Sequence, residues 1–245
     1  MLLVPGLDAW AAGCTIAKFD GRDGSGMSDI LSDEVSDLLA LANPEPDDTL
    51  DAMTEHGRDR GFPIVGPDVG RFLRFLATTV DAARIFEFGS GFGYSGAWWL
   101  DALPDDGELV LTDYDADNLA EAEDFLADYR GDTTVHYEAG DAMGTYDTYD
   151  GPWDVVLVDH DKTMYADAFE LVRDDLAPGG VVVADNMMAG PVEPEHVTTA
   201  LAGEEPIDDH TRGVVEYIER VRDDPDYETS FVPLGEGVGV SVKRP

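Results

Sequence analysis

The chain has 245 residues, of which 43% are hydrophobic, enough for one large α/β domain with a full core. Its 53 acidic and 15 basic residues give a formal net charge of −38. This argues against nucleic acid or an anionic membrane as a partner, because both are bound through basic patches.

A single cysteine, Cys14, excludes an internal disulfide framework and indicates a reducing, cytoplasmic environment. The acidic residues stand in ones and twos along predicted helix faces and turns, a pattern typical of halophilic proteins, in which molar salt shortens the reach of charge repulsion to about 3 Å. No stretch approaches the roughly 20 apolar residues of a membrane span. We expect residues 1–26 to be a disordered extension ending in the linker GRDGSG, and residues 27–245 to form a single domain.

Three helices are predicted ahead of the first strand. Ser28 or Asp29 can cap the first helix, and Pro67 suits the first turn of the third. The predicted helices run from Ser28 or Asp29 to residue 42, from Asp47 or Asp48 to about residue 60, and from Pro67 to about residue 76.

Residues 84–96, RIFEFGSGFGYSG, predict a strand at 85–88, a glycine-rich turn at 89–93 and a helix at 94–103. Glycines let the turn adopt positive φ and let a ligand approach the backbone without a Cβ in the way. The turn does not complete the dinucleotide pattern G-x-G-x-x-G, because Tyr94 occupies the place of the third glycine.

The next predicted strand, 109–112, ends at Asp113. An acid at this position can accept hydrogen bonds from two ribose hydroxyls, which both a dinucleotide and S-adenosylmethionine present. Glu87, just before the glycine turn, suits a cationic ligand and would repel a pyrophosphate, which favours S-adenosylmethionine. A third strand at 135–138 leads to residues 140–142, GDA, at the same rim, where an adenine could lie.

A β-α-β unit is predicted in the stretch that follows. Residues 155–158 and 181–184 are short apolar runs rich in β-branched residues, typical of buried strands. Residues 165–176 between them show helical apolar spacing, ended by the Pro-Gly-Gly break at 178–180. Such a unit makes two parallel strands.

Oxygen-bearing side chains end both strands of this unit: Asp159 follows the first, and Asp185 and Asn186 follow the second. If the strands are neighbours, about 4.8 Å apart, these side chains meet at the rim where open α/β sheets bind ligands. Lys162, one of only three lysines in the chain, lies in the same stretch.

The end of the chain predicts a loop, a helix and a hairpin. Residues 187–208 lack firm periodicity and predict a rim loop with at most short helical turns, followed by an amphipathic helix at 211–221. Strands at 229–234 and 238–242, joined by Gly-Glu-Gly, read as a β-hairpin. The expected fold is a Rossmann-like α/β sheet of seven strands, mostly parallel, with a C-terminal antiparallel hairpin and helices on both faces.

From about Met27 to its C-terminus the chain resembles cation-dependent, S-adenosylmethionine-dependent O-methyltransferases of the catechol and caffeoyl-coenzyme A type. The combination of D-H-x-K with A-D-N at the ends of successive strands is specific to that family. The terminal hairpin is also the expected ending of a class I methyltransferase sheet. The matching segments are EFGSGFGYS (87–95), LTDYD (111–115), GDA (140–142), DHDKTMY (159–165), ADN (184–186) and PLGEGVGVSVK (233–243).

The resemblance implies a role for each matching residue. Asp159, Asp185 and Asn186 would bind one divalent cation, in the first place Mg²⁺. Two carboxylates and an amide oxygen are indeed hard ligands, and no Cys/His set for zinc is present. Lys162 would be the general base beside the catalytic Asp159, and Glu216 would bind the substrate. The residues implied to contact S-adenosylmethionine are Val65, Glu87, Gly89, Ser90, Ser95, Asp113, Ala142, Asp159 and His160.

The methyl acceptor stays open at this point. Asp161 stands where catechol enzymes of this type carry a tryptophan, so the family resemblance identifies only a small hydroxylated molecule with adjacent oxygens. The family also implies a homodimer. Two alternatives are weighed: a nucleotide-linked oxidoreductase, disfavoured by Tyr94, Glu87 and the terminal hairpin, and a non-catalytic binding module, which we would expect to lose the metal set or Lys162.

Overall fold

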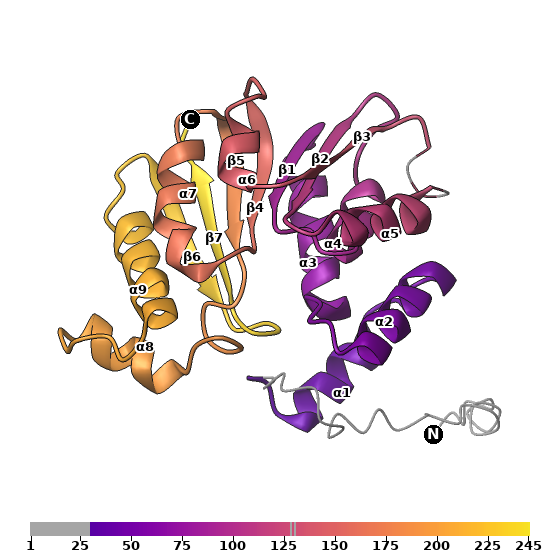
Figure 1. Ribbon diagram of the computed structural model, residues 1–245. Helices are drawn as coiled ribbons and strands as arrows, with labels where there is room; N and C mark the ends of the chain where they lie inside the picture. The colour runs from indigo at the N-terminus through magenta and orange to yellow at the C-terminus, as the bar shows by residue number, and fades with distance from the viewer. Residues whose placement is uncertain (1–29, 128, 130) are drawn as a thin grey trace, which may run out of the picture.

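The computed structural model describes residues 30–127, 129 and 131–245. In these residues seven strands form one sheet in the order β3-β2-β1-β4-β5-β7-β6 (Figure 1). The strands are β1 (Arg84–Phe88), β2 (Glu108–Asp113), β3 (Thr134–Ala139), β4 (Trp153–Val158), β5 (Leu176–Ala184), β6 (Tyr227–Val232) and β7 (Val238–Lys243).

Strand pairing is parallel from β3 through β5 and antiparallel where β7 joins β5 and β6. This confirms the expected seven-stranded, mostly parallel sheet with a C-terminal antiparallel hairpin. The helices are α1 (Asp33–Ala42), α2 (Asp48–Arg60), α3 (Gly66–Thr79), α4 (Tyr94–Leu100), α5 (Ala116–Leu126), α6 (Ala142–Tyr146), the 3₁₀ turn η1 (Lys162–Met164), α7 (Tyr165–Val172), α8 (Pro194–Leu201) and α9 (Asp209–Arg222).

Two hydrophobic cores cover the two faces of the sheet. Successive strand residues point to opposite faces, so Phe86 and Phe88 of β1 pack in one core with α6 to α9, while Ile85 packs in the other with α2 to α5. Figure 1 shows the first helix group gathered near β4 to β6 and the second near β1 to β3. Glu87 has the same parity as Ile85 and therefore faces α4.

The helix predicted at 165–176 is shorter in the structure. Helix α7 ends at Val172, and Leu176 already belongs to β5, paired with Trp153. The Pro-Gly-Gly break at 178–180 thus lies inside β5, where the register with β4 shifts. A proline and two glycines are tolerated at such an irregularity because the ladder there does not need every N–H.

Three helices also differ from the prediction. Helix α8 occupies part of the predicted rim loop; it buries only Val197 and Ala200, too few for a clear periodicity. Helix α5 lies between the second and third strands, where no helix is predicted. Helix α1 begins after Ser32, so the predicted residues Ile30 and Leu31 precede it. The predicted caps at 28 and 29 and the extension 1–26 lie outside the described residues.

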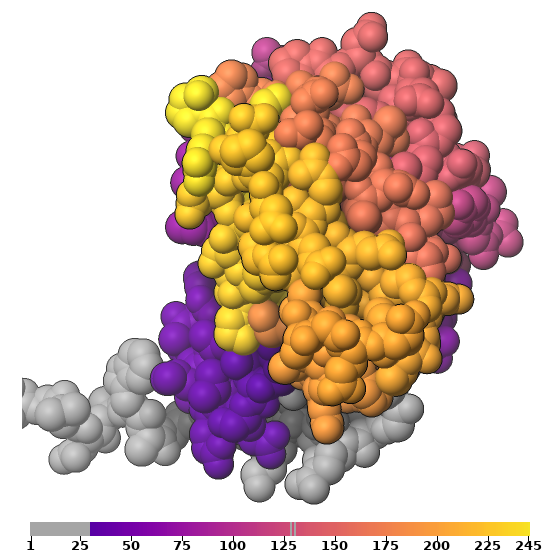
Figure 2. All heavy atoms as spheres, turned by 90° about the vertical axis from the view of Figure 1, so that its left-hand side faces the viewer, coloured from indigo at the N-terminus to yellow at the C-terminus, as the bar shows by residue number. Residues whose placement is uncertain are grey.

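The outer surface beside the hairpin is formed by α8 and α9. Figure 2, in which these helices appear in orange to gold, shows them covering the face turned toward the viewer. Among the residues that the structure describes, no helix is long and apolar enough to cross a membrane.

Candidate active site

The carboxyl ends of β1, β4 and β5 are level with one another. Phe88 pairs with Val158, and Val158 pairs with Ala184, so the residues that follow leave the sheet at the same height. The β1 and β4 ends are so close that a Cβ on Gly89 (φ +85°) would lie 2.5 Å from the carbonyl oxygen of Asp159. Only glycine fits this contact and this backbone conformation.

The carboxylate of Asp113 is held toward the glycine turn. Its Oδ2 accepts a hydrogen bond from the backbone N–H of Gly91 (3.0 Å). Its Oδ1 accepts from Asp115 N (2.8 Å) and from Nδ2 of Asn118 (3.2 Å). Ser90, in the same turn, accepts a hydrogen bond at its Oγ from Thr112 N (2.9 Å). The turn and the acid at the end of β2 thus form one connected unit.

Glu87 is buried rather than presented to solvent, with 1% of its surface exposed. Its carboxylate accepts hydrogen bonds from Oγ of Ser95 and from Nε1 of Trp99 (2.9 Å), both on α4. Burial raises the pKa of the Glu87 carboxyl to about 8 despite these hydrogen bonds, so the group is largely protonated at neutral pH. Two predicted cofactor residues, Glu87 and Ser95, therefore contact each other directly.

The predicted metal ligands come together at the ends of β4 and β5. Asp185 is buried, and its Oδ1 has no hydrogen-bond partner in the described part of the chain. Burial, with the nearby charge of Asp159, raises the pKa of the Asp185 carboxyl well above its usual range. Asn186, which follows, has left-handed backbone geometry (φ +59°).

This donor set fits a divalent cation. Within residues 30–127, 129 and 131–245, no three His, Cys, Asp or Glu side chains are grouped as a metal site. The predicted set differs in that its third member is the amide of Asn186. Two carboxylates and an amide oxygen suit a hard cation. A buried carboxylate oxygen without a partner is unfavourable unless a positive charge lies beside it.

Lys162 is buried in η1 next to these acids, with 6% of its surface exposed. Its Nζ donates hydrogen bonds to Oδ1 of Asp159 (3.0 Å), the carbonyl oxygen of His160 (3.2 Å) and the hydroxyl of Tyr165 (2.6 Å). These partners account for all three hydrogens of an ammonium group. The Lys162 side chain is therefore held in one position, close to the proposed metal ligands.

His160 lies between two aromatic rings, 5.4 Å from Phe88 and 5.6 Å from Tyr165, measured between centroids. Neither of its ring nitrogens has a hydrogen-bond partner within the part of the chain that the structure describes. Burial, with the charge of Lys162, lowers the pKa of the imidazole to about 4, so the ring is neutral at physiological pH.

Three predicted site residues lie at the margins of this group. Val65 precedes α3, and Ala142 begins α6 directly after β3. Glu216 is exposed on α9 and lines a pocket of about 300 Å³ with Thr163, Asp209, Arg212 and Gly213. An added Cβ on Gly213 would lie 2.1 Å from the carbonyl oxygen of Lys162, so this pocket adjoins η1.

Two residues that the sequence reasoning does not assign also belong to the site. Tyr165 accepts the hydrogen bond from Lys162, and Glu236, in the turn between β6 and β7, accepts one from the amide of Asn186. Glu236 could have been identified from the sequence, because it is a charged residue between two glycines in a turn that the predicted hairpin places at the sheet rim.

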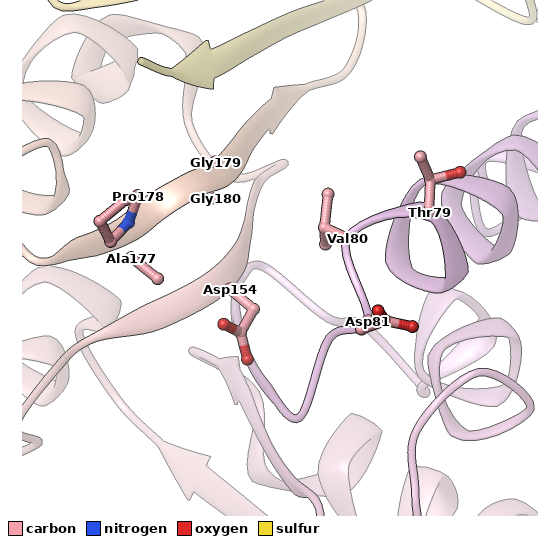
Figure 3. A pocket seen from close by; sticks show the side chains of 8 residues that line it. All are labelled: Thr79, Val80, Asp81, Asp154, Ala177, Pro178, Gly179 and Gly180. Atoms are coloured by element: carbon pink, nitrogen blue, oxygen red, sulfur yellow. The ribbon is translucent and has the colours of Figure 1, made fainter. Parts of the chain in front are cut away.

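A second pocket, of about 290 Å³, lies at the opposite end of the parallel strands, beside the starts of β4 and β5. Figure 3 shows the loop after α3 on one side of it, and the start of β4 and residues 177–180 of β5 on the other. Its acid Asp154 accepts hydrogen bonds from the backbone N–H groups of Ala83 and Arg84 (2.8 and 2.9 Å). Asp154 thus has a structural role, anchoring the start of β1.

Comparisons with known proteins show which family the chain resembles. The O-methyltransferase family model matches residues 48–244. A catechol O-methyltransferase of Niastella koreensis is 34% identical over 161 residues, which cover 63% of this chain and 71% of that protein. A caffeoyl-CoA O-methyltransferase of Petroselinum crispum is 26% identical over 70% of this chain and 73% of its own.

Solved structures show the same likeness. The O-methyltransferase TomG from Streptomyces achromogenes, involved in tomaymycin synthesis and solved in complex with SAM, superposes with a TM-score of 0.74 at 25% identity, over 86% of this chain and 96% of TomG. These matches favour methyl transfer over the nucleotide-linked oxidoreductase weighed from the sequence. The chain belongs to the O-methyltransferase family, which includes the catechol and caffeoyl-CoA enzymes.

Proposed function

We propose that this protein transfers the methyl group of S-adenosylmethionine to a hydroxyl of a small molecule with two adjacent oxygens, and that it requires a divalent cation such as Mg²⁺. The observation that carries the proposal is the meeting of Asp159, Asp185 and Asn186 with a buried Lys162, at the strand ends beside the glycine turn. A binding module without catalysis would have no use for this buried lysine.

The cofactor would lie along the carboxyl ends of β1, β2 and β4. S-adenosylmethionine supplies the methyl group, activated on a sulfonium. Asp113, held by Gly91, is placed to accept the ribose hydroxyls. The neutral ring of His160 and the start of α6 at Ala142 would border the adenine. The SAM complex of TomG supports S-adenosylmethionine as the cofactor.

The cation would be held by Asp159, Asp185 and Asn186. When bound, such a cation supplies positive charge that lowers the pKa of a hydroxyl chelated beside it. Within this set, Oδ1 of Asp185 is the buried atom that has no hydrogen-bond partner among the described residues. Asp159 has a second role, because it also accepts a hydrogen bond from Lys162.

Lys162 is the group placed to handle the acceptor's proton. We propose that its Nζ takes the hydroxyl proton or, in the ammonium form, steadies the oxyanion. Tyr165 and Asp159 hold the amine in position for either role. Positioning of the oxygen against the methyl group then supplies much of the rate acceleration.

The decisive experiment is methyl transfer from radiolabelled S-adenosylmethionine to a panel of vicinal diphenols and caffeoyl-type acceptors, in high potassium chloride, with Mg²⁺ or with EDTA. Labelled product that disappears with EDTA is the expected result. Product that persists in EDTA would refute the cation requirement. No product, together with no calorimetric binding of S-adenosylmethionine to folded protein, would refute the proposed function altogether.

The homodimer and the adaptation to high salt stay predictions. Light scattering in high potassium chloride tests the first. Unfolding measured over a range of salt concentrations tests the second: the midpoint should rise with salt, because screening weakens the repulsion within a chain of net charge −38.

A further inference from the structure

We infer that Glu236 is a positioning residue that orients the side-chain amide of Asn186, so that the amide oxygen is the atom left for the cation. The inference rests on the proposed cation site. It adds a residue from the β6–β7 turn to a group that otherwise comes from the ends of β4 and β5.

The hydrogen bond between the two side chains decides the orientation of the amide. Nδ2 of Asn186 donates to Oε2 of Glu236. An ionised carboxylate only accepts hydrogen bonds, so the reverse orientation would set the amide oxygen against the carboxylate oxygen. Because nitrogen and oxygen occupy the two arms of one planar group, holding Nδ2 on Glu236 leaves Oδ1 for another partner. Oxygen, not the NH₂ group, is the atom that a hard cation needs.

The backbone around both residues is clamped. The N–H groups of Met188 and Ala189 each donate to the carbonyl oxygen of Glu236 (2.9 Å), and the N–H of Met187 donates to that of Gly237 (2.9 Å). These bonds attach the segment after β5 to the hairpin turn. The Glu236 side chain therefore begins from a fixed point next to Asn186.

The contact also needs space and an unusual backbone. Asn186 has φ +59°, a left-handed conformation that asparagine tolerates better than most residues but that still needs support from its surroundings. A Cβ on Gly190 would collide with the carboxylate of Glu236, so glycine there leaves room for the side chain. Glu236 is half-buried, which strengthens its hydrogen bond relative to one in water.

One other role for Glu236 is an added negative charge that attracts the cation. It is separated from the orienting role by a pair of substitutions of matched size and charge. Glu236→Gln and Glu236→Met both remove the charge and the carboxylate. Only glutamine keeps an oxygen that can accept the hydrogen bond from Asn186.

The experiment measures Mn²⁺ affinity of metal-free protein by electron paramagnetic resonance in high potassium chloride, without substrate or turnover. High salt weakens Mn²⁺ binding to the acidic surface, and the site-specific fraction is the part that Asp185→Asn removes. We expect Glu236→Met to bind Mn²⁺ about 10–100-fold more weakly than the native protein, as for other residues that orient metal ligands. Glu236→Gln should recover most of that loss.

Glu204→Gln changes an exposed glutamate after α8 and should bind like the native protein. Equal affinities of the Gln and Met variants, whether both weak or both native, would overturn the orienting role. Native protein without any site-specific Mn²⁺ binding would refute the proposed cation site itself and this inference with it. Glu236→Ala provides the same comparison if the methionine variant does not fold.

Discussion

The two halves of the sheet rim differ in how their polar groups are satisfied. At β1 and β2, Glu87 has two hydrogen-bond donors on α4, and Asp113 has three from the turn and α5. At β4 and β5, Asp185 keeps a buried oxygen that has no partner among the described residues, beside Asn186 with its left-handed backbone. The first half is complete within the protein. The second leaves room for the proposed cation.

The difference separates binding from chemistry. A prearranged surface with satisfied hydrogen bonds can receive a cofactor with little rearrangement. A buried acid with a raised pKa favours the protonated form, and a cation bound beside it would favour the ionised form instead. We therefore expect substitutions at β4 and β5 to affect turnover, and substitutions at β1 to affect stability and cofactor binding.

The largest effect is expected from Lys162→Ala. Loss of the group that handles the hydroxyl proton should lower kcat by about 10²–10⁴-fold, while calorimetric affinity for S-adenosylmethionine stays nearly unchanged. Glu216 lines the pocket beside η1, and Glu216→Gln serves as a comparison variant for the predicted acceptor side, which should change KM more than kcat. Turnover of Lys162→Ala close to the native value would remove the lysine from the mechanism.

Asp185→Ala should lower turnover by about 10²–10³-fold, as expected for loss of one preorganised electrostatic group. The residual rate should no longer respond to Mg²⁺ or EDTA. The metal-free variant should also resist urea at least as well as the native protein at neutral pH, since a buried carboxylate with a raised pKa is removed. An active variant that still responds to Mg²⁺ would contradict the assignment of the site.

Glu87→Gln tests the other half of the rim through the pH dependence of stability. The folded pKa of about 8 lies above the unfolded value of 4.5, so the folded state holds the proton more tightly between these two pH values. This group therefore lowers the free energy of unfolding as pH rises from about 4.5 to 8, by a few kcal/mol in all. Urea unfolding at pH 5 and pH 8 should show a smaller decrease for the variant. Parallel curves for the two proteins would show that Glu87 does not titrate as inferred.

The smallest effect is expected at the contact between the two halves. Gly89→Ala introduces a Cβ 2.5 Å from the carbonyl oxygen of Asp159 at φ +85°. The backbone conformation alone costs about 1–2 kcal/mol, and the contact adds to it. Gly179→Ala is the matched control, because Gly179 has φ +82° with nothing within 4 Å of its added Cβ. Equal losses of thermal stability would mean that the rim accommodates the methyl group.

Much of the site follows from chain order and residue type. The parallel strands that end at Asp113, Asp159 and Asp185 are predictable because apolar, β-branched runs mark buried strands, and crossover connections make them parallel. The prediction of helix at 165–176 was wrong at its end, because an apolar leucine at position 176 fits either element. In the structure Leu176 pairs with Trp153 and therefore belongs to β5.

What the sequence by itself determined is thus the position of the strands along the chain, the glycine turn and the acids that follow the strands, since these depend on local pattern. Only the tertiary structure decided which groups are satisfied. Glu87 is buried because α4 covers its side of β1, and Ser95 and Trp99 reach it from there. Glu236 meets Asn186, 50 residues away in the chain, because antiparallel pairing of β5 with β7 brings the hairpin turn to the end of β5.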